Sequence, residues 1–180
     1  MIRRTSLLAG LLSAAVLLCA FPILPAGAAR IDWFLQPVWE RASRFSEGLA
    51  AVRSGGYWGY IDPGGRWVVG PTLSDAHPFR EGAAAVSVQG RWGFLDRKGK
   101  FFIPPAFDAA GSFCGELAAV RSADKWGYVD RAGRLAIPAS FDLAGDFYQG
   151  RAAVALGGRY GFIDRRGKWA VDPIYDGAWP

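Results

Sequence analysis

A nine-residue pattern recurs four times in this 180-residue chain, at a constant spacing of 34 residues and with no insertion between copies. The copy that begins at Trp92 reads WGFLDRKGK, and the others read WGYIDPGGR, WGYVDRAGR and YGFIDRRGK. Self-similarity at a period of about 20 to 50 residues is typical of arrays in which each unit packs mainly on its neighbours. The repeat therefore predicts a stacked array. The pattern opens with the aromatic and glycine pairs Trp58 and Gly59, Trp92 and Gly93, Trp126 and Gly127, and Tyr160 and Gly161.

A helical array is not expected, although tetratricopeptide units have the same length. Every unit contains several glycines and at least one proline, and the longest stretch without either after residue 29 is the eleven residues 116–126. A pair of helices per unit would require two such stretches of about 10 to 15 residues, with apolar residues at helical spacing. The composition of the unit therefore favours strands.

Each unit is predicted to be an antiparallel meander of three short strands. In the second copy these are 84–88, 92–96 and 100–104, joined by the glycine-containing turns QGR and RKG. The segment PAFDAAGSFCGEL is expected to cross to the next unit. We predict an all-β repeat array of three-stranded antiparallel meanders stacked as a solenoid or superhelix, and a small β-propeller is the alternative.

Two columns of the repeat are interpreted as structural. The glycine after each aromatic residue has no side chain, so an indole or the neighbouring backbone is expected to approach it closely. An aspartate followed three residues later by glycine opens the second turn of each copy, where Asp can accept a hydrogen bond from the backbone. These aspartates are Asp62, Asp96, Asp130 and Asp164.

At this point the chain resembles the WG-repeat family of bacterial proteins. The segments FSEGLAAV, RWGFLDRKGKFFIPPAFDAAGSF and KWGYVDRAGRLAIP carry the resemblance, which covers about residues 33–175 and begins and ends within a unit. One departure is Glu116, which occupies a place where the other units have glycine, so that either this place does not require a positive φ or Glu116 is strained. The resemblance implies a binding or scaffolding module and no particular activity.

The first 29 residues have the pattern of a secretory signal peptide. Arg3 and Arg4 precede the apolar run LLAGLLSAAVLLCAF, and small residues near Ala28 and Ala29 suit cleavage after either one. The alternatives are an uncleaved anchor, a twin-arginine signal and lipidation at Cys19. We predict an exported protein, periplasmic or extracellular, with residues 30–180 forming the repeat domain and no stable membrane span after cleavage.

The mature chain offers few groups for metal or nucleophilic chemistry. His77 is the single histidine and Cys114 the single cysteine after residue 29, so that no intramolecular disulfide, transition-metal site or cofactor is expected. No G-x-S-x-G motif is present, and we predict a protein without enzymatic activity. The alternative is a cell-envelope hydrolase that uses two acids such as Glu116 and Asp146.

Basic residues recur with the repeat and indicate a binding role. Removing residues 1–29 lowers the net charge from +5 to +3, because it removes two arginines and no acid. Nucleic acid is therefore not expected as a partner, whereas an evenly spaced basic column suits an anionic envelope polymer, a glycan or a protein. The alternative is that these cations only keep strand edges solvated. The column, which is our candidate ligand-binding site, is Arg66, Lys100, Arg134 and Lys168.

Overall fold

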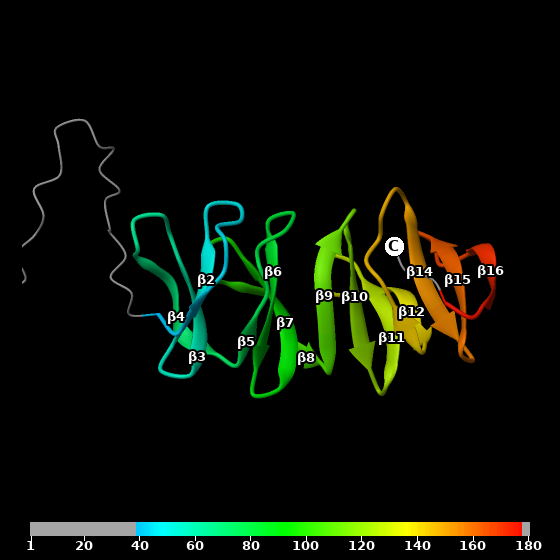
Figure 1. Ribbon diagram of the computed structural model, residues 1–180, viewed down its shortest axis with the longest axis horizontal. Coiled ribbons are helices and arrows are strands. Elements are labelled where there is room, and N and C mark those ends of the chain that lie inside the picture. The colour runs from blue at the N-terminus through cyan, green and yellow to red at the C-terminus, as the bar shows by residue number, and fades with distance from the viewer. Residues whose placement is uncertain (1–38, 178–180) are drawn as a thin grey trace, which may run out of the picture. The chain divides into compact units, whose positions relative to one another are not determined.

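All regular secondary structure in the described part of the chain is β-strand. The structure is a computed structural model that describes residues 39–177. Within this range the strands form four antiparallel sheets of four strands each, and every sheet keeps its strands in chain order (Figure 1). The predicted all-β repeat array is confirmed. No helix within residues 39–177 has the length and hydropathy that crossing a membrane would require.

The strand bounds repeat from sheet to sheet with the period of the sequence. The first sheet contains β1 (Arg41–Ala42), β2 (Ala50–Ser54), β3 (Tyr57–Ile61) and β4 (Trp67–Leu73). The second contains β5 (Asp75–Ala76), β6 (Ala83–Val88), β7 (Arg91–Asp96) and β8 (Phe101–Phe107). The third contains β9 (Ala109–Cys114), β10 (Leu117–Ser122), β11 (Lys125–Val129) and β12 (Leu135–Phe141). The fourth contains β13 (Leu143–Ala144), β14 (Arg151–Leu156), β15 (Arg159–Asp164) and β16 (Trp169–Tyr175).

Each meander has one strand more than the sequence predicted. The extra strand is the first of each sheet and comes from the segment that we expected only to cross between units. In the second sheet it is two residues long and pairs Asp75 with Ser87 and Ala76 with Val86. A single residue, Ser74, separates it from the last strand of the preceding sheet. Consecutive sheets are therefore adjacent.

The core lies between consecutive sheets. Contacts between sheets join β4 with β6, β6 with β9 and β12 with β14. One buried cluster combines Tyr60 of the first sheet with Phe79 and Leu95 of the second, and equivalent clusters follow at the next two junctions. Each sheet thus stabilises its neighbours by burying apolar side chains against them, as expected for a repeat array.

The glycine of each aromatic and glycine pair lies against the backbone of the next strand. A Cβ atom on Gly93 would lie 2.6 Å from the carbonyl oxygen of Ile103 and 2.7 Å from the nitrogen of Pro105. The pairing of β7 with β8 is irregular at the same place, between Trp92 and Phe94. The predicted close approach is therefore made by the neighbouring backbone, and at Gly59 the ring of Trp67 also contributes.

Candidate functional site

The aspartate column closes the second turn of each meander. One carboxylate oxygen of Asp96 accepts hydrogen bonds from the amides of Lys98 and Lys100, both at 2.9 Å. Asp130 and Asp164 make the equivalent pairs of bonds. The amide of Lys168 is the main reason why the pKa of Asp164 lies below its ordinary value. These carboxylates are occupied by their own turns.

The predicted basic column is exposed and is followed by an apolar column. All four basic side chains are exposed, and Arg134 is the member that forms an ion pair, with Asp130 at 2.7 Å. Among residues 39–177 the other three have no acidic partner within ion-pair distance. The next residue is large and apolar in every sheet, and three of these are 39 to 47% exposed. We call the following set the cation-apolar row: Arg66 and Trp67, Lys100 and Phe101, Arg134 and Leu135, and Lys168 and Trp169.

A second basic column is engaged in ion pairs. It stands directly before the aromatic and glycine pairs, and each member contacts an aspartate 17 residues further along the chain. Lys125 lies 2.5 Å from Asp142, and this ammonium group is the main reason why the pKa of Asp142 lies below its ordinary value. The remaining pairs are Arg91 with Asp108 and Arg159 with Asp176.

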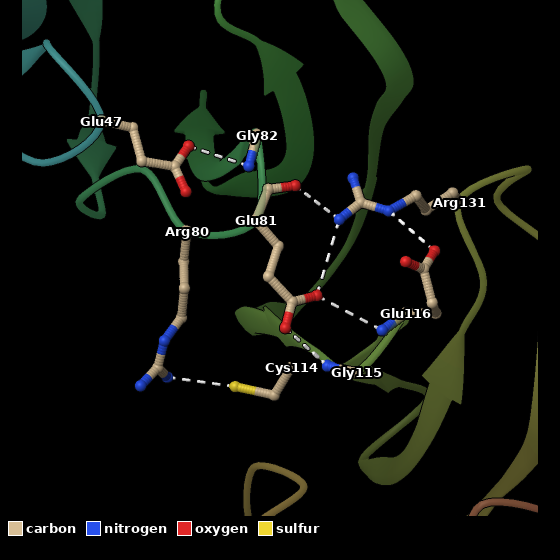
Figure 2. A network of polar contacts seen from close by, with 8 residues as sticks. All are labelled: Glu47, Arg80, Glu81, Gly82, Cys114, Gly115, Glu116 and Arg131. Atoms are coloured by element: carbon tan, nitrogen blue, oxygen red, sulfur yellow. Dashed lines mark hydrogen bonds and ion pairs between the residues drawn. The ribbon is translucent and has the colours of Figure 1, made fainter.

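Arg131, from the turn between β11 and β12, holds two sheets together. Its guanidinium donates to the carbonyl oxygen of Glu81 at 2.5 Å and to the carboxylate of Glu116 at 3.1 Å (Figure 2). The same group lies 4.7 Å from the centre of the Phe113 ring, within the range of a cation-π contact. This arginine is therefore part of the junction between the second and third sheets.

A ladder of glutamates links the loops that precede β2, β6 and β10. The carboxylate of Glu47 accepts the amide of Gly82 at 2.8 Å, and that of Glu81 accepts the amides of Gly115 and Glu116 at 2.7 and 3.3 Å (Figure 2). The bond from Gly115 is the main reason why the pKa of Glu81 lies below its ordinary value. Sequence reasoning did not identify this ladder, although Glu-Gly recurs in the first two units.

Glu116 departs from the ladder, and the structure decides between the two interpretations of it. Its φ is 72°, in the left-handed region that disfavours residues other than glycine, so this place does require a positive φ and Glu116 is strained. Gly115 stands in the glutamate column instead. The guanidinium of Arg165 lies where a side chain of residue 115 would begin, and this flexible group would have to move aside for any other residue.

The two acids of the hydrolase alternative are bonded to different arginines. Glu116 accepts from Arg131, and Asp146 accepts from Arg80 at 3.2 Å. Arg80 also donates to the sulfur of Cys114 at 3.1 Å (Figure 2). Burial raises the pKa of this thiol, which therefore stays protonated near neutral pH.

The histidine and the remaining acids form no metal site in the part of the chain that the structure describes. The His77 ring packs 4.8 Å from the ring of Trp92, and burial lowers its pKa. No group of three His, Cys, Asp or Glu side chains among residues 39–177 is arranged to hold a metal ion.

A cavity of about 540 Å³ lies over the last sheet. Phe162 of β15 and Ala153 of β14 contribute apolar surface, and Phe147 and Tyr148 of the preceding loop complete it. Arg151 and the pair of Arg80 and Asp146 provide charged groups at its wall. Sequence reasoning did not find this cavity, because its residues come from three different units.

The comparisons with known proteins give one family match. The model of a family described as WG containing repeat matches five successive stretches, residues 32–58, 58–92, 92–126, 126–160 and 160–180. No curated protein matches the chain.

Solved structures resemble the chain only weakly. Kluyveromyces lactis Hsv2 with complete loop 6CD is 10% identical over 73% of this chain and 45% of its own, with a TM-score of 0.45. The extracellular domain of the hybrid two component system BT3049 from B. thetaiotaomicron is 13% identical over 79% of this chain and 23% of its own, with a TM-score of 0.46. The WD40 beta propeller domain of Doa1 is 11% identical over 72% of this chain and 52% of its own, with a TM-score of 0.43. The chain thus spans about half or less of each.

Proposed function

The chain belongs to the family of WG containing repeat proteins, and we propose that it is an exported, non-enzymatic binding module whose cation-apolar row holds an anionic polymer of the cell envelope. The observation that carries this proposal is the row itself. Its basic members are exposed in all four sheets, and each stands beside a large apolar residue. A polymer that carries both charged groups and hydrocarbon surface would find both kinds of contact in every unit.

The other basic columns strengthen the case for this row. Lys125 and its equivalents are held by aspartates, and Arg131 is held within the junction between two sheets. In the row, three of the four cations have no ion pair among residues 39–177, and Arg134 is the exception. Several weak contacts repeated along one partner give an avidity that a single exposed cation would not give.

Export is supported by the sequence of residues 1–29, which lie outside the described residues. General secretion with cleavage after Ala28 or Ala29 agrees best with the short apolar run and the small residues at its end. N-terminal sequencing of the exported protein should then begin at Ala29 or Arg30. An intact Met1 on membrane-bound material would contradict the proposed cleavage.

The proposed absence of enzymatic activity is supported by the hydrogen-bond partners of the two candidate catalytic acids, Glu116 and Asp146. A hydrolase with two carboxylates requires them about 5 to 9.5 Å apart, with one kept protonated by a raised pKa. Glu116 and Asp146 instead accept from Arg131 and Arg80 respectively. Each of the two carboxylates is thus bonded to its own arginine within the fold.

The binding role is tested with alginate as an anionic polysaccharide and dextran as a neutral one. The test variant replaces Arg66, Lys100 and Lys168 by Gln, and the matched control replaces Arg91, Lys125 and Arg159 by Gln, so that both lose three positive charges. If each exposed cation contributes about 0.5 kcal/mol, the test variant should bind alginate about tenfold more weakly at low salt. The control should lose much less, and dextran should not bind.

Three results would contradict the proposal. Equal losses in both variants would mean that only net charge matters. Unchanged binding by the test variant would exclude the row. New reducing ends released from the polymer by the purified parent would show that the protein is an enzyme.

A further inference from the structure

The three junctions between sheets repeat one aromatic contact. In each, a phenylalanine that precedes the second strand of its sheet packs on an aromatic ring of the preceding sheet, and its own exposed fraction is 7% or less. We call the phenylalanine the plug and the ring beneath it the socket. The pairs are Phe79 on Tyr60, Phe113 on Phe94 and Phe147 on Tyr128, with ring centres 4.9, 4.8 and 4.8 Å apart.

Within residues 39–177, the first and the last sheet each have half of this contact. Phe45 is the plug of the first sheet and is 46% exposed, in contrast to the 2, 0 and 7% of its equivalents. Phe162 is the socket ring of the last sheet and is half-buried, whereas Tyr60, Phe94 and Tyr128 are fully buried. The cavity of about 540 Å³ lies over Phe162. It is therefore the socket of a fourth junction.

We infer that a second copy of this chain docks end to end, with its Phe45 plug entering the Phe162 socket. The resulting contact would be the same as the Phe113 and Phe94 contact within the chain, because both of its rings are phenylalanine. The occupant follows from the repeat, since the internal junctions show what fits such a socket and the first sheet carries the matching side chain. The inference does not rest on the cation-apolar row.

A second contact of the internal junctions supports the same docking. The turn glycine of each following sheet rests on an aliphatic residue, as Gly167 rests on Ile137, where a Cβ atom would lie 3.0 Å away. Ile137 is 3% exposed, while its equivalent in the last sheet, Val171, is 37% exposed. Docking would bring Gly65 of the second copy onto Val171 and remove that apolar surface from water.

The charges at the two ends also match. Within the chain, Glu81 faces Arg131 across a junction, with an ion-pair distance of 3.6 Å. At the two ends the positions equivalent to Glu81 and Arg131 are uncharged. Gln149 of the last sheet stands in place of the glutamate, and Pro63 of the first sheet stands in place of the arginine. Docking would therefore place a neutral residue opposite a neutral one at this position, so that neither of these two columns would contribute a buried charge without a partner. The Gln149 amide oxygen can accept the Gly48 amide, as Glu47 accepts that of Gly82.

Because the plug and the socket are different surfaces of one chain, each docked copy still has one of each. Such a heterologous contact continues into a filament, or closes into a ring if the rotation between copies allows it. The expected behaviour of the parent is a mean mass that rises with concentration.

The test uses two variants that each block one end. Phe45→Glu removes the plug, and Ala153→Arg fills the socket. Tyr57→Glu is the control, because Tyr57 is a similarly exposed aromatic residue, at 53%, that belongs neither to the plug nor to the lining of the cavity. If Ala153→Arg fails to fold, as judged by circular dichroism, Val171→Arg takes its place. The protein is purified in the form in which the producing cell accumulates it, with or without residues 1–29. Its sedimentation velocity is measured at micromolar to millimolar concentrations.

The expected result is specific to a plug and socket. Each blocked variant alone should be monomeric, their equimolar mixture should form a dimer and nothing larger, and Tyr57→Glu should associate like the parent. A parent that stays monomeric throughout the range would overturn the inference, and so would a folded Phe45→Glu variant that associates like the parent. Two monomeric variants that do not combine when mixed would also overturn it.

Discussion

Replacing Gly93 by alanine should be far more damaging than replacing Gly90, three residues earlier in the same hairpin. The new Cβ at residue 93 would lie 2.6 to 2.8 Å from three backbone atoms of the neighbouring strand. Ordinary contacts at this position would need about 3.4 Å or more, so β7 and β8 must separate where their pairing is already irregular. Overpacking a core typically costs about 1 to 3 kcal/mol, and we expect about 3 kcal/mol because backbone atoms cannot rotate away.

Gly90 provides the matched comparison. It has a φ of 80° and nothing within 4 Å of an added Cβ, so only left-handed strain opposes alanine. That strain is about 1 to 2 kcal/mol, and the lower entropy of the unfolded alanine variant offsets about half of it. Urea titrations followed by tryptophan fluorescence measure both free energies of unfolding. If Gly93→Ala loses no more stability than Gly90→Ala, the close approach of the β8 backbone does not explain the glycine column.

Three further predictions concern single side chains. Glu81→Gln should lower the free energy of unfolding by about 0.5 to 1 kcal/mol at neutral pH. Because the pKa of Glu81 is lowered in the folded state, its contribution to stability is present above the ordinary carboxyl pKa and is lost as pH falls through the folded value. The stabilities of parent and variant should therefore converge when both are measured in acid. Burial lowers the pKa of His77, so the parent should lose more stability than His77→Ser as pH falls below about 6.5. Equal losses of stability in parallel pH titrations would refute this. Phe113→Ala should cost about 3 to 5 kcal/mol and Phe45→Ala only about 1 kcal/mol in dilute solution, and similar losses by thermal unfolding would contradict the exposure difference.

The sequence was informative wherever one unit determines its own structure. The turn at Asp96 and the close approach at Gly93 were predicted because each depends on residues within one hairpin. The same is true of the strand character of each unit, since alternation and turn residues are local signals. Three of the four extra strands were missed because a strand of two residues has no alternation that a sequence pattern could reveal, and the fourth, β9, lies in the segment that we expected only to cross between units.

Contacts between units were beyond the sequence pattern. The Glu81 column is visible as a repeat, but its partners are backbone amides of the following unit, and any residue can supply an amide. The exposure of the Phe45 ring was equally hidden, because the sequence contains four equivalent phenylalanines and only the packing separates the first from the rest. The basic column, by contrast, could be identified from the sequence because its members recur every 34 residues. The structure adds that Arg134 is the member that forms an ion pair.

The passage from one sheet to the next through a single residue has a consequence for how the molecule opens. Single residues such as Ser74 connect consecutive sheets, and in the part of the chain that the structure describes the inner sheets pack on two neighbouring sheets whereas the outer sheets pack on one. Local opening in such an array begins where a unit has the fewest neighbours and proceeds inward one sheet at a time. Amide hydrogens of the two middle sheets should accordingly exchange last, and a second copy docked at an end would slow the outermost exchange first.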